Sequence, residues 1–186
     1  AQPFRAIAHN GEINTFRGNK NWMKVHEQEM DSNLFEDIEN LKPVIQPGTS
    51  DSAALDNVFE LLNISGQPAP LAKLMLVPDA WSKKSKVLSK DHQQLFNFLN
   101  STMEPWDGPA AIAGTDNEWV IAANDRNGLR PLRYTITKDK FLFAGSETGM
   151  IKLNEKKILA KGRLGPGEII GAVSYTHLRA HETPRY

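Results

Sequence analysis

The stretch Phe4-Arg5-Ala6-Ile7-Ala8-His9-Asn10-Gly11-Glu12-Ile13-Asn14 organises this chain. Ile7 and Ala8 are typical of the end of a buried strand, and Asn10-Gly11 is a turn signal. A tight turn behind a rigid strand can present an Asn side-chain amide next to a Gly N–H. Two N–H donors aimed at one point suit a developing oxyanion. Taken alone, however, Asn10-Gly11 is also typical of an ordinary hairpin turn.

The overall composition excludes several classes of function. The chain has 186 residues, which suits one domain or part of a larger one. Lys plus Arg equals Asp plus Glu at 22 each, so no basic field favours nucleic acid as a partner. The sequence has no cysteine, hence no disulfide, thiolate metal site or internal Cys nucleophile. Since no signal peptide or apolar run of membrane-spanning length is visible, we expect a cytoplasmic protein without membrane contact.

The clearest helix signal is Ser50-Asp51-Ser52. Ser50 and Asp51 both suit an N-cap, and an acidic residue in the first turn favours the positive end of the helix dipole. The next residues place Leu55, Val58, Phe59 and Leu62 on one face. Ser65-Gly66 predicts the end of this helix.

Three further helices are predicted at 22–30, 68–78 and 91–103, with another helical turn at 33–38 and a loop at 42–50. Their apolar faces would be formed by Trp22 and Val25, by Leu71, Leu74 and Met75, and by Leu95, Phe98, Leu99 and Met103. Short apolar runs at 110–113, 119–123, 132–136 and 141–144 are separated by turn residues and predict an antiparallel meander. Runs at 158–160 and 168–170 flank a Gly-rich turn. Helices followed by strands, with one strand at the start, predict an α+β fold.

Long motifs then follow one another in a fixed order. They are 1–5, 8–15, 18–19, 21–23, 50–53, 55–57, 75–81, 106–110, 125–131, 146–149 and 161–168. In these motifs the chain closely resembles the glutaminase domain of the glutamate synthase large subunit, a member of the class II glutamine amidotransferases. The resemblance covers about residues 1–170, and the blocks at 19–23 and 162–168 favour glutamate synthase within the class.

The resemblance implies an N-terminal-nucleophile hydrolase-type fold, a four-layer αββα sandwich that lacks its first strands here. It also implies that an N-terminal Cys attacks the side-chain amide of L-glutamine, with its own α-amino group as base. Asn10 Nδ2 and the Gly11 N–H would form the oxyanion hole. Asp51 would bind the glutamine α-ammonium, with help from Glu12. His9 would orient the turn, and the 125–133 block would stabilise the interior of the domain.

This sequence departs from the family pattern in two ways. The nucleophilic Cys is missing, and so is the upstream segment that supplies an Arg for the glutamine carboxylate. We therefore expect a fragment truncated at both ends and inactive by itself. Residues 1–172 would be a partial amidotransferase domain, and 173–186 an unstructured or non-native tail. His177 and His181 are four apart, but without a third ligand no metal site is predicted.

The resemblance also implies what the parent protein contains. Its synthase domain would carry FMN and an iron–sulfur cluster, take electrons from NAD(P)H or ferredoxin and aminate 2-oxoglutarate. A small NAD(P)H-oxidising subunit is a further expected partner, whereas no cofactor is expected in the fragment itself. Two alternatives stay open: another class II amidotransferase, such as an amidophosphoribosyltransferase-like enzyme, or a non-catalytic regulatory domain of the same fold.

Overall fold

The computed structural model describes residues 2–80 and 89–173. Strand β1 (Ile7–Gly11) comes first, as the sequence predicts, and helices precede the remaining strands. The helical elements are α1 (Phe16–Glu29), the 3-10 helix η1 (Ile38–Leu41), α2 (Asp51–Ile64), α3 (Ala69–Leu76) and α4 (Lys90–Thr102). The later elements are β2 (Ala110–Thr115), β3 (Trp119–Asn124), β4 (Arg133–Thr137), β5 (Leu142–Gly145), the 3-10 helix η2 (Glu155–Lys157), β6 (Ile158–Arg163) and β7 (Ile169–Val173).

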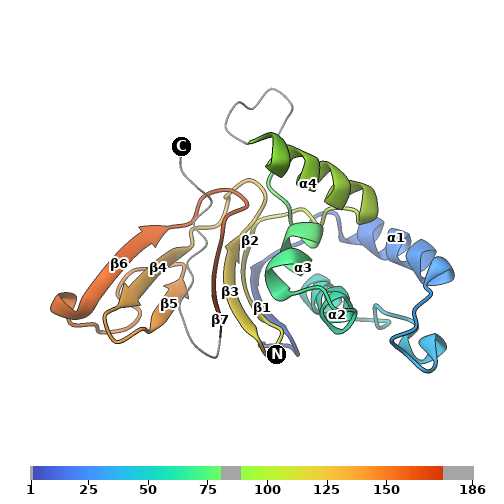
Figure 1. Ribbon diagram of the computed structural model, residues 1–186, viewed down its shortest axis with the longest axis horizontal. Helices are drawn as coiled ribbons and strands as arrows, with labels where there is room; N and C mark the ends of the chain where they lie inside the picture. The colour runs from blue at the N-terminus through green and yellow to red at the C-terminus, as the bar shows by residue number, and fades with distance from the viewer. Residues whose placement is uncertain (1, 81–88, 174–186) are drawn as a thin grey trace.

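The described residues form three layers (Figure 1). The α-helices lie on one side of a four-stranded sheet with the order β1-β2-β3-β7, and a three-stranded sheet, β5-β4-β6, lies on its other side. Every strand pair is antiparallel. The α+β class and the two antiparallel sheets are thus confirmed. In the described part of the chain, one helical layer of the expected sandwich is present.

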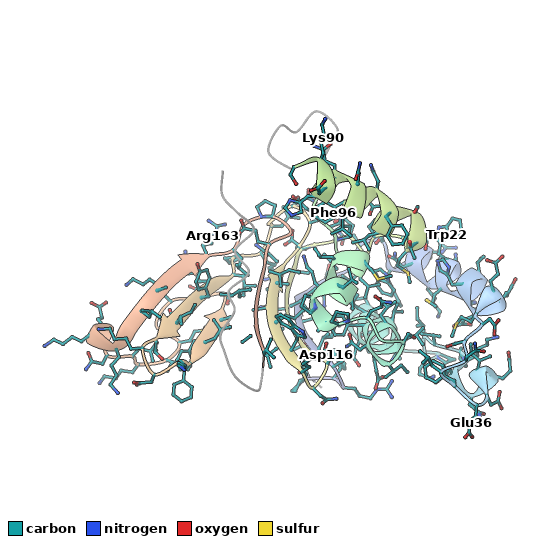
Figure 2. The ribbon with its side chains drawn as sticks, in the orientation of Figure 1. Trp22, Glu36, Lys90, Phe96, Asp116 and Arg163 are labelled. Carbon is teal, nitrogen blue, oxygen red and sulfur yellow. The ribbon has the colours of Figure 1, made fainter. Side chains whose placement is uncertain are left out.

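Helices α2 and α3 are fixed at their N-termini by capping oxygens. Ser50 Oγ accepts a hydrogen bond from the Ala53 N–H at 3.2 Å, as an N-cap serine should. Asp116 lies in the turn between β2 and β3, where the first sheet meets the helical layer (Figure 2). Its Oδ2 accepts from the Ala69 N–H at 2.6 Å and so caps α3. The start of α3 is therefore tied to the sheet on which it packs.

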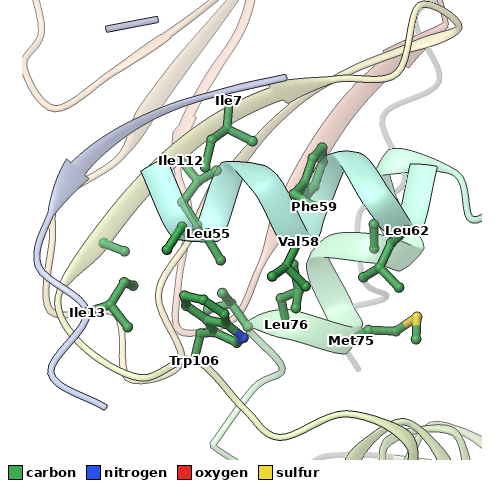
Figure 3. Packing of buried hydrophobic residues seen from close by; sticks show 14 of the residues in the cluster. Ile7, Ile13, Leu55, Val58, Phe59, Leu62, Met75, Leu76, Trp106 and Ile112 are labelled. Atoms are coloured by element: carbon green, nitrogen blue, oxygen red, sulfur yellow. The ribbon is translucent and has the colours of Figure 1, made fainter. Parts of the chain in front are cut away.

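The main core lies between α2 and the first sheet (Figure 3). Leu55, Val58 and Phe59 on α2 are at most 2% exposed, and they pack with apolar residues of β1 and β2. Burial of side chains of this size stabilises a fold by roughly 1.5–3 kcal/mol each. The predicted apolar face of α2 is confirmed. A smaller cluster joins the two sheets and contains Ala122, Leu132, Ile136, Leu164 and Ile170.

Helix α1 differs from its prediction. It begins at Phe16 rather than at Trp22, and both Trp22 and Val25 are exposed. Its inner face carries the buried Met23 together with polar contacts. Asn19 Nδ2 donates to the Pro105 carbonyl at 3.0 Å, and His26 Nε2 lies 2.7 Å from Glu104 Oε2. Because part of this contact is polar, the spacing of Trp22 and Val25 selects the wrong face.

Two other helical predictions need correction. On α4 the buried residues are Phe96 and Leu99, whereas Leu95 and Phe98 are exposed. The predicted turn at 33–38 is not helical, and η1 begins only at Ile38. Asp37 explains this start, since its side chain accepts from the Glu39 N–H at 3.0 Å and caps η1.

The predicted meander is wrong in one respect, because β2 and β3 belong to the first sheet and β4 and β5 to the second. The chain leaves the first sheet directly after Asn124, at the buried Asp125. Strand β7 returns to the first sheet beside β3 and extends to Val173. The rest of the predicted tail, with His177 and His181, lies outside the described residues.

Candidate active site

The end of β1 is an extended strand rather than the predicted turn. Asn10 and Gly11 pair with Ala111 and Ala110 of β2, and Asn10 is exposed. The two paired strands approach so closely that a Cβ on Gly11 would lie 1.8 Å from the Pro109 carbonyl oxygen, and φ of Gly11 is +151°. Only glycine fits such an approach. The dipeptide therefore marks a close backbone approach that the Asn-Gly turn signal does not reveal.

A second glycine makes the same close approach from the segment that precedes β2. A Cβ on Gly108, whose φ is +152°, would lie 2.0 Å from the Glu12 carbonyl oxygen. The Glu12 N–H donates to the Pro109 carbonyl at 3.0 Å and continues the pairing of the two strands. The backbone around Gly11 is thus held against this segment, which suits a site in which an N–H donor has to be aimed.

Asp51 reaches the segment after Gly11 from the start of α2. Its Oδ2 accepts from the Ile13 N–H at 2.7 Å, and its Oδ1 accepts from the Ser52 N–H at 2.7 Å. The side chain is half-buried. The structure therefore brings Asp51 next to the segment that follows Asn10 and Gly11. Helix α2 supplies a fixed carboxylate beside the end of β1.

His9 points to the other face of β1 and packs against α2. It is 4% exposed, and its Nδ1 lies 2.6 Å from Ser52 Oγ. Burial lowers the pKa of His9; the Asp51 charge opposes this shift and the Arg130 charge adds to it. The imidazole is therefore neutral near pH 7. Its Nε2 is buried and makes no hydrogen bond to a described residue.

Glu12 is exposed and forms no ion pair within 2–80 and 89–173. The sequence leaves open that Glu12 pairs with one of the arginines of the 125–133 block, and the structure shows no such pair in the described residues. Arg126 instead donates to the Pro78 carbonyl at 3.3 Å and lies 3.5 Å from Asp107. Among the described residues, the Glu12 carboxylate therefore has no ion-pair partner that would compete with a ligand.

Asp125 stabilises the interior, as the sequence predicts for its block. It is fully buried, and its carboxylate accepts from four backbone N–H groups at 2.9–3.1 Å. These belong to Ala110, Asn127, Leu129 and Arg130. A buried carboxylate is stable when its oxygens are satisfied in this way. Asp125 thus links the start of β2 to the loop that leads to the second sheet.

Asp56 is a positioning residue that sequence reasoning misses. It is 2% exposed on α2 and accepts from the N–H groups of Ala6 and Ile7 at 2.8 Å and of Arg5 at 3.2 Å. It fixes the start of β1 to the helix. A signal exists in the sequence, since an aspartate at i+4 from Ser52 interrupts an otherwise apolar helix face.

Lys73 is a second missed residue, because apolar spacing draws attention to Leu71, Leu74 and Met75 on the same helix. Lys73 is 1% exposed, and its Nζ donates to the Gly167 carbonyl at 2.8 Å. Burial lowers the pKa of Lys73 to about 7, against the opposing charges of Asp79 and Asp125. Burial also raises the pKa of Asp79, which the Lys73 charge opposes. These charges tie α3 to the Gly-rich turn before β7.

A groove of about 540 Å³ lies on the second sheet. Residues of β4, β5 and the 147–155 segment line it, and none of the predicted site residues does. In the described ranges, no three His, Cys, Asp or Glu side chains group in a way that could hold a metal ion. No helix in that part of the chain is both long and apolar enough to span a bilayer.

Comparison with known proteins identifies the family of this chain. The family model described as "Glutamine amidotransferases class-II" matches residues 1–179. The chain belongs to this family. The resemblance noted in the sequence is thereby confirmed.

The curated relatives are glutamate synthases. The chain is 56% identical over 171 residues to the glutamate synthase [NADPH] large chain of Azospirillum brasilense, covering 91% of this chain and 11% of that protein. It is 41% identical over 179 residues to the ferredoxin-dependent glutamate synthase of Pyropia yezoensis, covering 95% of this chain and 12% of that protein. The chain thus spans about a tenth of the length of these relatives.

A solved structure is also similar. The glutamine phosphoribosylpyrophosphate amidotransferase of B. subtilis matches with a TM-score of 0.41 and 20% identity, over 90% of this chain and 27% of that one.

Proposed function

We propose that this chain is the glutaminase domain of a glutamate synthase, which hydrolyses L-glutamine to glutamate and ammonia. The ammonia would serve the reductive amination of 2-oxoglutarate in another part of the parent protein. The high identity to glutamate synthases along nearly the whole chain supports this function. The observation that carries it is the Asp51 carboxylate held beside the end of β1 by the Ile13 N–H at 2.7 Å.

In this proposal each site residue has one role. Asn10 Nδ2 and the Gly11 N–H stabilise the oxyanion formed on the side-chain carbonyl of glutamine. Asp51 binds the α-ammonium through a charge-assisted hydrogen bond, and Glu12 adds a second negative charge nearby. Asp51 suits the task because backbone N–H groups fix its carboxylate before the substrate arrives.

The nucleophile is proposed to come from outside these 186 residues, because the sequence contains no cysteine. A cysteine sulfur would attack the amide carbon, and its proton would pass through the α-amino base to the departing nitrogen as the C–N bond breaks. Ammonia leaves, and water then hydrolyses the thioester to glutamate and the free thiol. The chain by itself should have no glutaminase activity.

The names of the relatives give NADPH or ferredoxin as electron donors. We propose that FMN, an iron–sulfur cluster, one of these donors and a small NAD(P)H-oxidising subunit act with the synthase domain. A cluster of this kind needs cysteine ligands, which this chain lacks. The glutaminase domain would contribute ammonia alone. The cytoplasmic location stays a prediction.

Steady-state kinetics of the full-length protein with Asp51→Ala test this function. The loss of a charge-assisted bond should raise the KM for glutamine by roughly tenfold or more. Glutamate formation from 2-oxoglutarate and added ammonium should be unchanged. Asp91→Ala, at an exposed position in the first turn of α4, is the matched control.

An unchanged KM for glutamine would refute the assignment of Asp51. The acceptor distinguishes the alternatives: ammonia transfer to phosphoribosylpyrophosphate instead of 2-oxoglutarate would indicate the amidophosphoribosyltransferase-like enzyme. A full-length protein without any glutaminase activity would indicate the regulatory domain.

A further inference from the structure

We propose that His9 and Ser52 are a pair of positioning residues, which hold the Asp51 carboxylate in the orientation that receives the substrate's ammonium group. This inference rests on the proposed function and assigns roles to two side chains outside the substrate site. Neither residue needs to touch glutamine.

The first argument is the place of the pair in the fold. His9 directly precedes Asn10 on β1, and Ser52 directly follows Asp51 on α2. Both are buried, at 4% and 7% exposure, and Nδ1 of His9 lies 2.6 Å from Ser52 Oγ. One short buried hydrogen bond therefore connects the strand that carries Asn10 to the helix that carries Asp51.

The second argument concerns the direction of the hydrogen bonds. Ser52 Oγ is also 3.4 Å from Asp51 Oδ1, to which it can donate its only proton. It can do so only if it accepts from His9, which requires the neutral tautomer with the proton on Nδ1. The chain of bonds then runs from His9 Nδ1–H to Ser52 Oγ–H and on to Asp51.

The third argument is the state of the other ring nitrogen. In this tautomer Nε2 is an acceptor, and it is the buried atom that makes no hydrogen bond to a described residue. In the other tautomer a buried N–H would be left unsatisfied, and the Ser52 proton would be used on His9 instead of Asp51. A buried N–H without a partner is rarer, and costs more free energy, than a buried acceptor without a partner.

Together with the Ile13 and Ser52 N–H groups, the Ser52 hydroxyl completes a set of three donors around Asp51. A carboxylate has about four acceptor positions, so these three donors leave one position for the ammonium group of the substrate. The carboxylate can then bind the substrate without reorientation. Loss of the hydroxyl should therefore weaken substrate binding more than it weakens the fold.

The test is steady-state glutaminase kinetics of the full-length protein with Ser52→Ala, Ser52→Thr and Ser65→Ala. Ser65 is the matched control because its hydroxyl donates to the Leu61 carbonyl at 2.7 Å, at the far end of the same helix. We expect Ser52→Ala to raise the KM for glutamine about tenfold, as expected for one lost hydrogen bond to a charged group. Ser52→Thr keeps the hydroxyl and should have the normal KM. Ser65→Ala should also have the normal KM, although it loses about as much thermal stability as Ser52→Ala.

A double-mutant cycle separates positioning from general destabilisation. In an Asp51→Asn background, Ser52→Ala should raise the KM no further, because the two residues act through one carboxylate. Effects that multiply in the double variant would overturn the proposal, and so would a Ser52→Ala protein with the KM of Ser65→Ala.

If Ser52→Ala does not fold, two substitutions of His9 provide the test. His9→Asn keeps a donor near the position of Nδ1 and should retain a nearly normal KM, whereas His9→Gln should raise it. The reverse order would overturn the proposal. Should Asp51→Ala leave the KM unchanged, the proposed function itself fails; should only Ser52→Ala do so, the positioning role alone fails.

Discussion

At the scale of single residues, the conformation of Asn10-Gly11 is set by a close approach of two backbone segments and not by local turn chemistry. Asn10-Gly11 could be recognised from the sequence as special, but it was predicted as a turn and is part of a strand. The reason is Pro109, which comes from a distant part of the sequence and lies close beside the strand. A contact of this kind cannot be read from spacing, whereas Asp51 could be located from its place at a helix start.

The substitution Gly11→Ala tests the close approach between β1 and the segment before β2. The new Cβ would meet the Pro109 carbonyl, so we expect a loss of about 3 kcal/mol in stability from strain and displacement. Gly48→Ala is the control, because Gly48 has φ of +77° with no atom within 4 Å of a Cβ. It should cost only about 1 kcal/mol. Thermal unfolding measures the stability of both variants, and equal losses of stability would contradict the close approach at Gly11.

Lys73 gives a pH-dependent prediction. Its folded pKa of about 7 lies below the ordinary 10.5, so between these values the unfolded chain binds more protons than the folded one. Its contribution to stability should therefore rise as pH increases from 7 toward 10. We expect Lys73→Met to flatten this rise in thermal unfolding between pH 7 and 9, whereas Lys90→Met, at an exposed position, should follow the wild type. If stability changed with pH in the same way in all three proteins, folding would not lower the pKa of Lys73.

At the scale of elements, prediction succeeds where signals agree. Helix α2 has a capping serine, an apolar face and a terminal glycine, and its bounds match the sequence expectation. Helix α1 buries Asn19 and Met23 in place of Trp22, and α4 buries Phe96 in place of Phe98, beside the correctly predicted Leu99. Local pattern cannot show which face a neighbouring element covers.

The link between α2 and β1 can be tested through Asp56. Asp56→Ala leaves three backbone N–H groups without their acceptor, so the start of β1 should open more often. Hydrogen–deuterium exchange of the peptide around residues 4–11 should become at least tenfold faster. Asp91→Ala serves again as the control, and unchanged exchange with Asp56→Ala would mean that β1 is held by its pairing with β2 alone.

At the scale of the whole molecule, the sequence predicts the α+β class and the antiparallel pairing, but not the division of the strands between two sheets. That division depends on the buried Asp125, whose four backbone contacts organise the loop between β3 and β4. The resemblance implies only that the 125–133 block stabilises the interior of the domain. Its burial follows only from the packing of the two sheets.

The described surface also carries many exposed apolar side chains. Trp22, Phe98, Phe141 and Leu159 are all more than half exposed. Apolar exposure of this kind favours association. We expect residues 1–186 to aggregate when produced alone, as measured by light scattering. A monodisperse monomer with a cooperative melting transition would contradict this.

The central claim is that the end of β1 is an oxyanion hole. The most direct measurement is the glutaminase kcat of the full-length protein with Asn10→Ala, beside Asn100→Ala at an exposed position on α4 as the control. The account predicts a fall in kcat of about 10²–10³ for Asn10→Ala, with no comparable change in the KM for glutamine or in ammonia-dependent glutamate formation. A kcat equal to that of the Asn100→Ala control would contradict it.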